Sequence, residues 1–428
     1  MTTYIDAQAS LGRLCPAELS RLMTVFENEG EHAYLVGGCV RDALMQKTPH
    51  DWDIAVTTPP ERTVAICERH QLKCIPTGIA HGTVTVLLSD KTPVEATTCR
   101  TEGEYSDSRH PDSVSFTDRI ENDLCRRDFT VNAMAATLDF ASGEFKIIDL
   151  FGGIDDLNAG IIRCVGNPET RFTEDALRIL RAVRFASRFN FSIEPATEAA
   201  IKIASSGLSN ISRERISSEL ELILTSDSAD RGIKSLRDLG LLPHFARASD
   251  GGLITDSLCV ATLPRSYPVR LAAFLYLLGL PKSELAPTLK ELRLPTATVK
   301  ECLTYLEADV TPEPTPLGAR RLRHNFGAHA DNLLAFMAAL GINGMTSESA
   351  RELSELIKAS EESGDCVTLH ELAIDGKRLS ELGIPRGKAT GMILDALLDA
   401  VISDPSLNRD DVLCELGVKI YKNSPKNA

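Results

Sequence analysis

The residue types best suited to chemistry lie close together near the N-terminus. A short apolar run leads into Gly37 and Gly38, and Arg41 follows them. A glycine pair lets backbone N–H groups approach an anion, and arginine pairs with phosphate oxygens. Asp51 and Asp53 come next, and on a strand the side chains of residues two apart project to the same face. The cluster predicts a magnesium and triphosphate site, whereas an isolated pair of acids is usually only a surface turn.

This cluster resembles the first motif of a nucleotidyltransferase family that comprises eubacterial and eukaryotic CCA-adding enzymes and bacterial poly(A) polymerases. The matching pattern is Gly-Gly-x-x-Arg-Asp at 37–42, with Asp-x-Asp at 51–53. The resemblance implies that Asp51 and Asp53 hold Mg²⁺ for catalysis. It also implies that Gly37, Gly38 and Arg41 position the triphosphate of the incoming nucleotide.

A third acid and a second motif extend the prediction. Glu95 follows a predicted strand at 83–88, and if this region pairs beside the Asp51 strand, Glu95 adds a carboxylate to the site. A lone glutamate on a strand edge is otherwise simply solvated.

The segment 126–133, Arg-Arg-Asp-Phe-Thr-Val-Asn-Ala, is nearly identical to the second motif of the family. The resemblance implies that Asp128 selects ribose, while Asn132 and one or both arginines, of which Arg127 is the candidate, hold sugar and triphosphate. An ordinary salt bridge is the alternative.

Glu174, Asp175 and Arg178 form the pattern that bears on base choice. On a helix, their spacings of three and four residues place all three on one face, where a simple ion pair contributes a few tenths of a kcal/mol. The functional alternative is that these residues choose the base, and it follows from the hydrogen-bond donors and acceptors that each base presents. Cytosine and adenine offer an amino donor beside a ring-nitrogen acceptor, which an aspartate and an arginine match, whereas uracil and guanine leave these groups unpaired. This agrees with the Glu-Asp-x-x-Arg motif of the family, in which Glu174 would hold Arg178.

Two further features complete the candidate site: one arginine and one loop. Arg181 lies one helical turn beyond Arg178, and we include it in the predicted nucleobase-binding set. The segment 102–111 is polar and contains glycine and proline, which predicts a loop. Such a loop is often a plain connector. In CCA-adding relatives, however, a flexible loop at this place helps to change specificity from C to A, and Arg109 is its candidate residue.

Composition limits the classes of function. The 428 residues carry a net charge of -14, so a polyanionic partner must be held through local basic patches. The 11 cysteines include no C-x-x-C pair, and the chain has no apolar run long enough to span a bilayer. We therefore expect reduced cysteines, a cytoplasmic location and no membrane partner. The sequence leaves the oligomeric state open.

The predicted fold class is α+β. We expect a mixed α/β nucleotidyltransferase head with a small sheet, followed by all-helical neck, body and tail. The predicted boundaries are 1–155 for the catalytic head, 156–225 for the base-recognising neck, and 226–315 and 316–428 for a body and a tail that bind tRNA.

The predicted activity is template-independent addition of CCA to tRNA 3′ ends from CTP and ATP, with Mg²⁺ as cofactor and the tRNA acceptor arm as partner. A CC-adding or A-adding enzyme and a bacterial poly(A) polymerase share the main motifs and remain alternatives. The sequence Gly-Ile-Ala-His-Gly-Thr-Val at 78–84 resembles the corresponding segment of CCA-adding relatives, and it favours CCA addition over polyadenylation. A non-catalytic RNA-binding module would have no need of Asp51 and Asp53.

Overall fold

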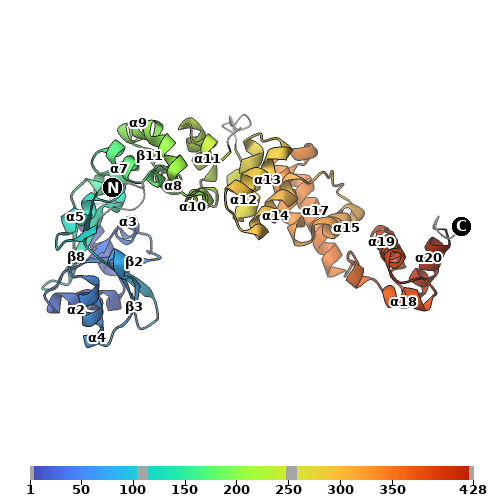
Figure 1. The fold of residues 1–428 in the computed structure, drawn as a ribbon, viewed down its shortest axis with the longest axis horizontal. Coiled ribbons are helices and arrows are strands. Elements are labelled where there is room, and N and C mark those ends of the chain that lie inside the picture. Colours follow the sequence, from blue (N-terminus) through green and yellow to red (C-terminus); the bar gives the residue numbers. More distant parts are fainter. Residues whose placement is uncertain (1–3, 104–113, 247–257, 424–428) are drawn as a thin grey trace. The chain divides into compact units, whose positions relative to one another are not determined.

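The structure is a computed structural model that describes residues 4–103, 114–246 and 258–423. Arg109, the residue predicted for the flexible loop, therefore lies outside the described residues. The chain divides into two compact units (Figure 1). Unit 1 comprises Met1–Asp256 with Glu291–Arg293, and unit 2 comprises Ser257–Lys290 with Leu294–Ala428. The predicted fold class, a mixed α/β head followed by helices, is confirmed.

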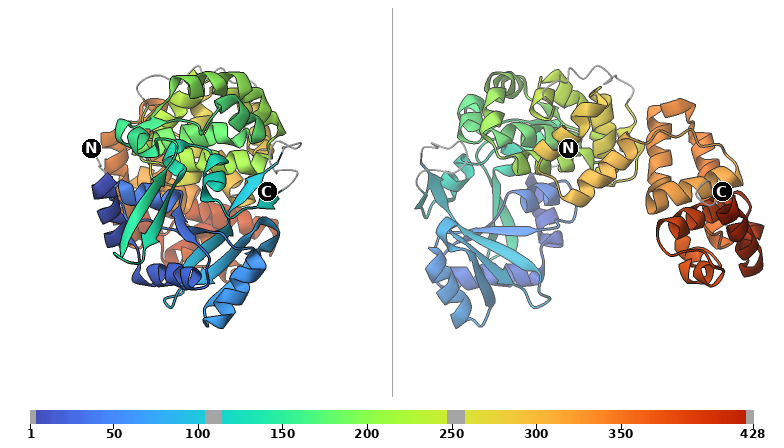
Figure 2. Two further views of the ribbon diagram at one scale, coloured as in Figure 1. Left: turned by 90° about the vertical axis from the view of Figure 1, so that its left-hand side faces the viewer. Right: turned by 45° about the vertical axis from the view of Figure 1, so that its right-hand side comes forward.

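A seven-stranded sheet organises the first part of unit 1 (Figure 2). From one edge to the other, its strands are β3 (Lys73–Gly78), β4 (Thr83–Leu87), β5 (Pro93–Thr98), β2 (Trp52–Val56), β1 (Ala33–Val36), β8 (Met134–Asp139) and β9 (Glu144–Asp149). Neighbouring strands run antiparallel except β2 and β5, which are parallel. This parallel pair lies at the centre of the sheet, where β2 buries Ile54 and Val56 completely. Helices surround the sheet: α1 (Tyr4–Leu14), α2 (Ala17–Asn28), α3 (Gly38–Leu44), α4 (Pro60–Arg69) and α5 (Ile120–Cys125).

The remainder of unit 1 is mostly helical. It contains the short strands β10 (Ile161–Ile162) and β11 (Ser192–Ile193), and the helices α6 (Gly153–Ala159), α7 (Pro168–Glu174), α8 (Leu177–Phe189), α9 (Pro195–Ala204), α10 (Arg213–Leu224) and α11 (Ala229–Asp238). A two-stranded hairpin of β6 (Arg100–Glu102) and β7 (Val114–Phe116) stands apart from the main sheet. Helix α7 begins at Pro168, and the Asn167 side chain caps it by accepting a hydrogen bond from the backbone N–H of Thr170.

One local prediction is wrong. The sequence pattern places Glu174, Asp175 and Arg178 on one continuous helix, but α7 ends at Glu174 and α8 begins at Leu177. Asp175 adopts an extended conformation between them, with φ -144° and ψ 102°. Its carboxylate accepts a hydrogen bond from the backbone N–H of Leu177 at 3.0 Å, so the side chain satisfies a donor at the start of α8.

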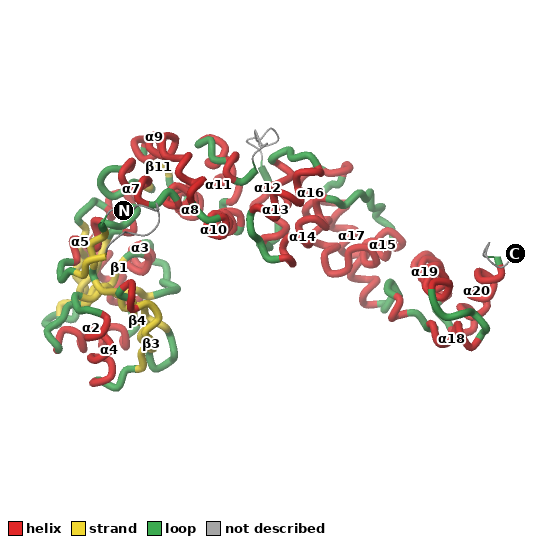
Figure 3. The backbone as a smooth tube through the Cα atoms, in the orientation of Figure 1, coloured by secondary structure: helices red, strands yellow, loops and turns green. Residues whose placement is uncertain are grey.

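Unit 2 is all-helical in the part that the structure describes, and Figure 3 shows that the strands belong to the N-terminal part of the chain. Helix α12 buries eight of its eleven residues, among them most of the apolar run that begins at Leu271. No helix among the described residues is long and apolar enough to cross a membrane. The helices that follow α11 are α12 (Tyr267–Leu277), α13 (Lys282–Glu291), α14 (Thr296–Leu306), α15 (Pro316–Phe326), α16 (Ala330–Leu340), α17 (Ser347–Glu362), α18 (Gly376–Glu381), α19 (Lys388–Ser403) and α20 (Asp410–Lys422).

Candidate active site

Three carboxylates meet at the parallel pair of strands in the sheet. Asp53 lies on β2 directly opposite Glu95 on β5, so the expected pairing of these two regions is confirmed. Asp51 immediately precedes β2 and is exposed, as is Glu95, whereas Asp53 is half-buried. Burial, followed by the negative charges of Glu95 and Asp51, raises the pKa of Asp53 to about 6, although Arg127 opposes the shift.

The donor chemistry of these acids fits a divalent cation. Within the described ranges, no group of three or more His, Cys, Asp or Glu side chains is arranged to hold a metal ion by itself. Mg²⁺ does not need such a cage, because it is commonly bound through one or two carboxylates together with phosphate oxygens of the substrate. Crowded carboxylates of like charge are also relieved by a cation. The neighbouring Asp51 and Asp53 therefore suit a metal that a nucleotide helps to bind.

Gly37 and Arg127 form the next part of the site. Gly37 has φ +72°, a conformation that favours glycine, and it leads into α3 at Gly38. A Cβ atom at Gly37 would lie 2.6 Å from Nη1 of Arg127, so the guanidinium packs directly over this turn. Arg127 donates to Asp123 at 3.0 Å, and Arg126 donates to the same carboxylate at 2.7 Å. Burial opposes ionisation of Asp123, but the charges of Arg127 and Arg126 outweigh it and lower its pKa.

Arg41, which the sequence assigns to the triphosphate, is buried with only 5% of its surface exposed. Its guanidinium donates to Asp42 at 2.7 Å and to the Asn132 side chain at 2.5 Å. It also lies over the ring of Phe189 on α8, 4.7 Å from the centroid. Burial lowers the pKa of Arg41, with Asp42 acting in the opposite direction. Arg41 therefore joins helix α3 to α8 as well as standing beside the glycine turn.

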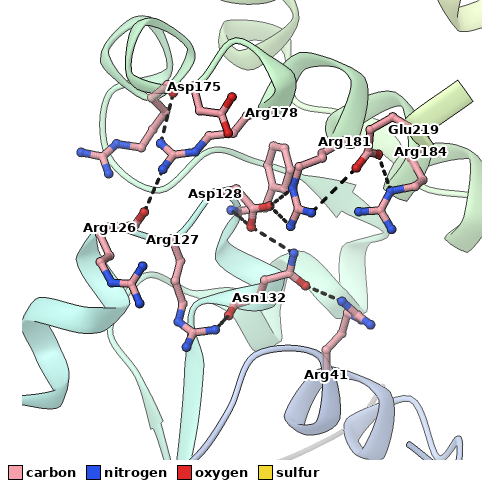
Figure 4. Close-up of polar contacts among 12 residues, drawn as sticks. Arg41, Arg126, Arg127, Asp128, Asn132, Asp175, Arg178, Arg181, Arg184 and Glu219 are labelled. Carbon is pink, nitrogen blue, oxygen red and sulfur yellow. Dashed lines mark hydrogen bonds and ion pairs between the residues drawn. The ribbon is translucent and has the colours of Figure 1, made fainter. Parts of the chain in front are cut away.

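Asp128 and Asn132 continue this network toward α8 (Figure 4). One oxygen of Asp128 accepts from Asn132 at 3.1 Å, and the other accepts from Arg181 at 2.6 Å. Burial alone would raise the pKa of Asp128, but the charge of Arg181 and these hydrogen bonds lower it to about 2. Beyond them, Glu219 on α10 accepts from Arg184 at 2.7 Å. A single chain of contacts thus joins α3, the segment around Asp128, α8 and α10.

Asp175 and Arg178 each have a separate ion-pair partner. Arg178 donates to Glu174 at 2.5 Å, so the predicted support of the arginine by the glutamate is present although the helix is interrupted. It also donates to the backbone carbonyl of Arg126 at 3.2 Å. Asp175 accepts from Arg215 on α10 at 2.8 Å. Nη1 of Arg215 is buried and has no hydrogen-bond partner in the described residues.

The structure adds supporting residues that the sequence reasoning missed. Helix α10 contributes two of them: Arg215 contacts Asp175, the predicted base reader, and Glu219 contacts two arginines of α8. Their spacing of four residues, which puts both on one face of α10, was the available signal. The additional supports are Asp123, Arg171, Arg215 and Glu219.

Comparison with known proteins adds an independent finding. Residues 33–163 match the family model described as "Poly A polymerase head domain". Residues 190–249 match "Probable RNA and SrmB- binding site of polymerase A", and residues 267–416 match a tRNA nucleotidyltransferase domain 2. Together these three segments cover most of the chain, and the first contains the carboxylates, the glycine turn and Asp128.

Whole-chain relatives agree with the family models. The CCA-adding enzyme of Limosilactobacillus fermentum is 34% identical over 403 residues, covering 94% of this chain and 96% of the relative. The CCA-adding enzyme of Bacillus subtilis is 39% identical over 285 residues, covering 66% of this chain and 69% of the relative. Among solved structures, the Bacillus stearothermophilus CCA-adding enzyme in complex with CTP matches with a TM-score of 0.82 and 32% identity, covering 96% of this chain and 98% of that one.

Proposed function

We propose a mechanism from the premise that this chain belongs to the CCA-adding enzymes, a family of tRNA nucleotidyltransferases. The activity is the addition of C, C and A to the 3′ end of tRNA from CTP and ATP, without a nucleic-acid template. In each step, the oxygen of the RNA 3′-hydroxyl forms a bond to the α-phosphorus. The bond from this phosphorus to pyrophosphate breaks, and pyrophosphate leaves.

Asp51 and Asp53 are the proposed catalytic and metal-binding carboxylates. The family uses a divalent metal, and we propose that it is Mg²⁺. When bound, such an ion stabilises the charge that develops on phosphate oxygens. Glu95 is the proposed third acid, because the register of β2 and β5 brings it opposite Asp53 and its charge contributes to the raised pKa of Asp53. Together, the three carboxylates make the electrostatic potential negative at the place where a cation must bind.

The proposed triphosphate and ribose site comprises the turn at Gly37 and Gly38 together with Arg127, Asp128 and Asn132. Arg127 supports this role because it lies over Gly37 while Asp123 fixes its guanidinium. For Arg41, the burial and the contacts with Asn132 favour a positioning role, in which it orients the amide of Asn132. Asp128 is accepting from both Asn132 and Arg181, so its carboxylate orients the groups around the proposed ribose position.

The choice of C and A rests on Asp175 and Arg178, and this pair is the observation that carries the proposal. Asp175 supplies an acceptor for an amino group, and Arg178 supplies a donor for a ring nitrogen. Each is held by a different ion-pair partner, Arg215 for the first and Glu174 for the second. Side chains that are oriented before the base arrives lose less freedom on binding. Arg181 completes the predicted base-binding set through its contact with Asp128.

The division into parts is also a proposal. We retain a catalytic head at 1–155, a neck at 156–225, and a body and a tail at 226–315 and 316–428 that hold the tRNA acceptor arm. The contacts of Asp128 with Arg181 join the proposed head to the proposed neck. We further propose a cytoplasmic location, because all 11 cysteines are free thiols, as in a reducing compartment.

The experiment supplies Mg²⁺ and tRNAs that end before, within or after the CC, with each nucleotide alone or in pairs, and then sequences the 3′ ends. Addition that stops at CCA supports the proposal. Ends that stop at CC, or that receive only the terminal A, indicate a partial enzyme, and long A tracts indicate a poly(A) polymerase. Addition by an Asp51→Ala variant at the wild-type rate would contradict the metal assignment.

The support of Asp175 by Arg215 gives a sharper test of base choice. We expect Arg215→Gln to lower kcat/KM for CTP and ATP by roughly tenfold to a hundredfold, because a misaligned acceptor loses a charge-assisted hydrogen bond of about 1.5–3 kcal/mol. The ratio of CTP to UTP incorporation should fall at the same time. Arg231→Gln is the matched control, since Arg231 is an arginine of the neighbouring helix α11 that contacts Asn190 and the backbone of Phe191. An unchanged ratio in Arg215→Gln would exclude this role.

A further inference from the structure

A cluster of positive charge surrounds two phenylalanine rings of helix α8. Phe185 and Phe189 stack with their centroids 5.8 Å apart and their planes at 5°. Within about 6 Å of one ring or the other lie five cationic side chains, which come from α3, the segment after α3, and α8 itself: Arg41, Lys47, Arg181, Arg184 and Arg188. Helices α3 and α8 and the segment after α3 all belong to unit 1, so the whole cluster lies within one compact unit.

Carboxylates balance only part of this charge. Asp42 pairs with Arg41, Asp128 with Arg181, and Glu219 with Arg184. In the part of the chain that the structure describes, neither Lys47 nor Arg188 has a carboxylate within ion-pairing distance. The positive charge of Arg188 also contributes to the lowered pKa of Arg41. Two positive charges are therefore left uncompensated in a chain whose net charge is -14.

Lys47 and Arg188 are exposed, and one ring brings them together. The Lys47 amine lies 5.9 Å and the Arg188 guanidinium 5.6 Å from the centroid of Phe189, which is itself buried. Contact with the ring face favours a cation there, but it leaves the N–H groups free to donate. Both charges thus lie within about 6 Å of the same ring centroid on exposed side chains, and an anion that reached both would be stabilised by each of them.

The position of the pair indicates which anion fits. Helix α3 spans seven residues, about 10 Å, and separates Lys47 from the glycine turn proposed for the triphosphate. Lys47 precedes Asp51 by four residues, so their Cα atoms are at most about 14 Å apart. A phosphate at Lys47 and Arg188 would thus lie away from the triphosphate turn, yet within a few nucleotides of an RNA end at the catalytic acids.

We propose that Lys47 and Arg188 form a subsite for a backbone phosphate of the RNA primer, close to its 3′ end. This inference rests on the proposed function, in which the RNA 3′-hydroxyl is the nucleophile. The subsite holds the end of the primer through charge and hydrogen bonds to phosphate, which carry no information about sequence. It therefore serves the first, second and third additions alike, while the neck residues choose the base.

The test measures addition of the first C to tRNA that lacks CCA, in full-length Lys47→Gln, Arg188→Gln and the double variant. We expect KM for tRNA to rise about two- to fivefold in each single variant, as for exposed ion pairs, and further in the double variant. KM for CTP should change less than twofold. The slope of log KM for tRNA against log salt should become shallower by about 0.7 for each lost contact, the value for single strands.

Two controls separate charge from folding. Arg188→Lys keeps the charge and should restore most of the affinity for tRNA. Lys73→Gln removes an exposed lysine from strand β3, far along the chain from the cluster, and should leave both KM values unchanged. The midpoint of thermal unfolding of each variant reports whether it is folded.

The outcomes are distinct. If KM for tRNA and its salt slope stay at wild-type values in the double variant, the subsite does not exist. A rise in KM for CTP in place of tRNA would show that the anion is the nucleotide triphosphate, and it would overturn the assignment to the primer. If the wild-type protein added no nucleotide at all, the proposed function itself would be contradicted. That result is distinct, because the wild-type protein still contains both Lys47 and Arg188.

Discussion

Gly37 is required by its own backbone and by the arginine beside it. Its φ of +72° with ψ of -124° is a backbone conformation that costs an L-residue about 1–3 kcal/mol, and a Cβ would come within 2.6 Å of the Arg127 guanidinium. We therefore expect Gly37→Ala to destabilise unit 1 by at least about 1 kcal/mol and to raise KM for CTP, because Arg127 must move. Urea unfolding and steady-state kinetics measure the two effects.

Gly38→Ala is the control for stability at the adjacent position. A Cβ at Gly38 would meet the Arg41 side chain at 3.6 Å, an ordinary contact, and the residue is already helical. Its free energy of unfolding should stay within about 0.5 kcal/mol of the wild type. Equal destabilisation by the two alanines would contradict the role given to the turn at Gly37.

Asp128 predicts a dependence of stability on pH. Its pKa of about 2 lies below the unfolded value, so ionised Asp128 stabilises the folded state by about 2 kcal/mol above pH 5. This contribution should be lost progressively as the pH falls from about 5 to 2. We expect Asp128→Asn to remove that part of the pH dependence in urea unfolding. Asp155→Asn, at an exposed carboxylate of α6, should retain it, and a wild-type pH profile in Asp128→Asn would refute the assignment.

At the scale of elements, the parallel pairing of β2 and β5 brings Glu95 opposite Asp53. If Glu95 supports the metal site, Glu95→Gln should raise the concentration of Mg²⁺ that gives half-maximal activity by roughly tenfold, because a negative charge beside the ligands is lost. Glu61→Gln, at an exposed acid in the first turn of α4, is the matched control. A titration with Mg²⁺ at saturating tRNA and CTP measures the shift. Equal requirements in wild type and Glu95→Gln would show that Glu95 is only solvated.

Sequence patterns predicted the elements that depend on local residues. The predicted strand at 83–88 follows from alternation of side chains and is present. The N-cap of α7 at Asn167 and the buried helix α12 likewise have local causes, a capping side chain and a run of apolar residues. The break at Asp175 was not predictable in this way, because no glycine or proline marks it. The carboxylate of Asp175 pairs with Arg215, forty residues away, in addition to accepting from the nearby backbone N–H of Leu177. Tertiary contacts of this kind override local helix propensity.

In the candidate site, too, some features could be predicted from local sequence and others depend on tertiary contacts. Motif spacing predicted which residues belong to it, but it did not predict that Arg41 is buried or that Asp123 holds two arginines. Those facts depend on the packing of α3 against α8 and of α5 against the sheet. A single sequence carries little signal for pairs that are distant in the chain, and charged residues such as Glu219 resemble ordinary surface residues until their partners are known.

At the scale of the whole molecule, the two compact units predict how ligands act on stability. All proposed nucleotide contacts lie in unit 1, so CTP with Mg²⁺ should stabilise that unit alone. At about 100 times its Kd, a ligand contributes about 2.7 kcal/mol, which for a unit of this size raises the midpoint by roughly 5–10 °C. Calorimetry should therefore resolve two transitions, of which only one moves with CTP. UTP at the same concentration should move neither, since Asp175 and Arg178 leave it unmatched. Equal shifts of both transitions would mean that the units unfold as one, and an equal shift by UTP would mean that base choice is not made at binding.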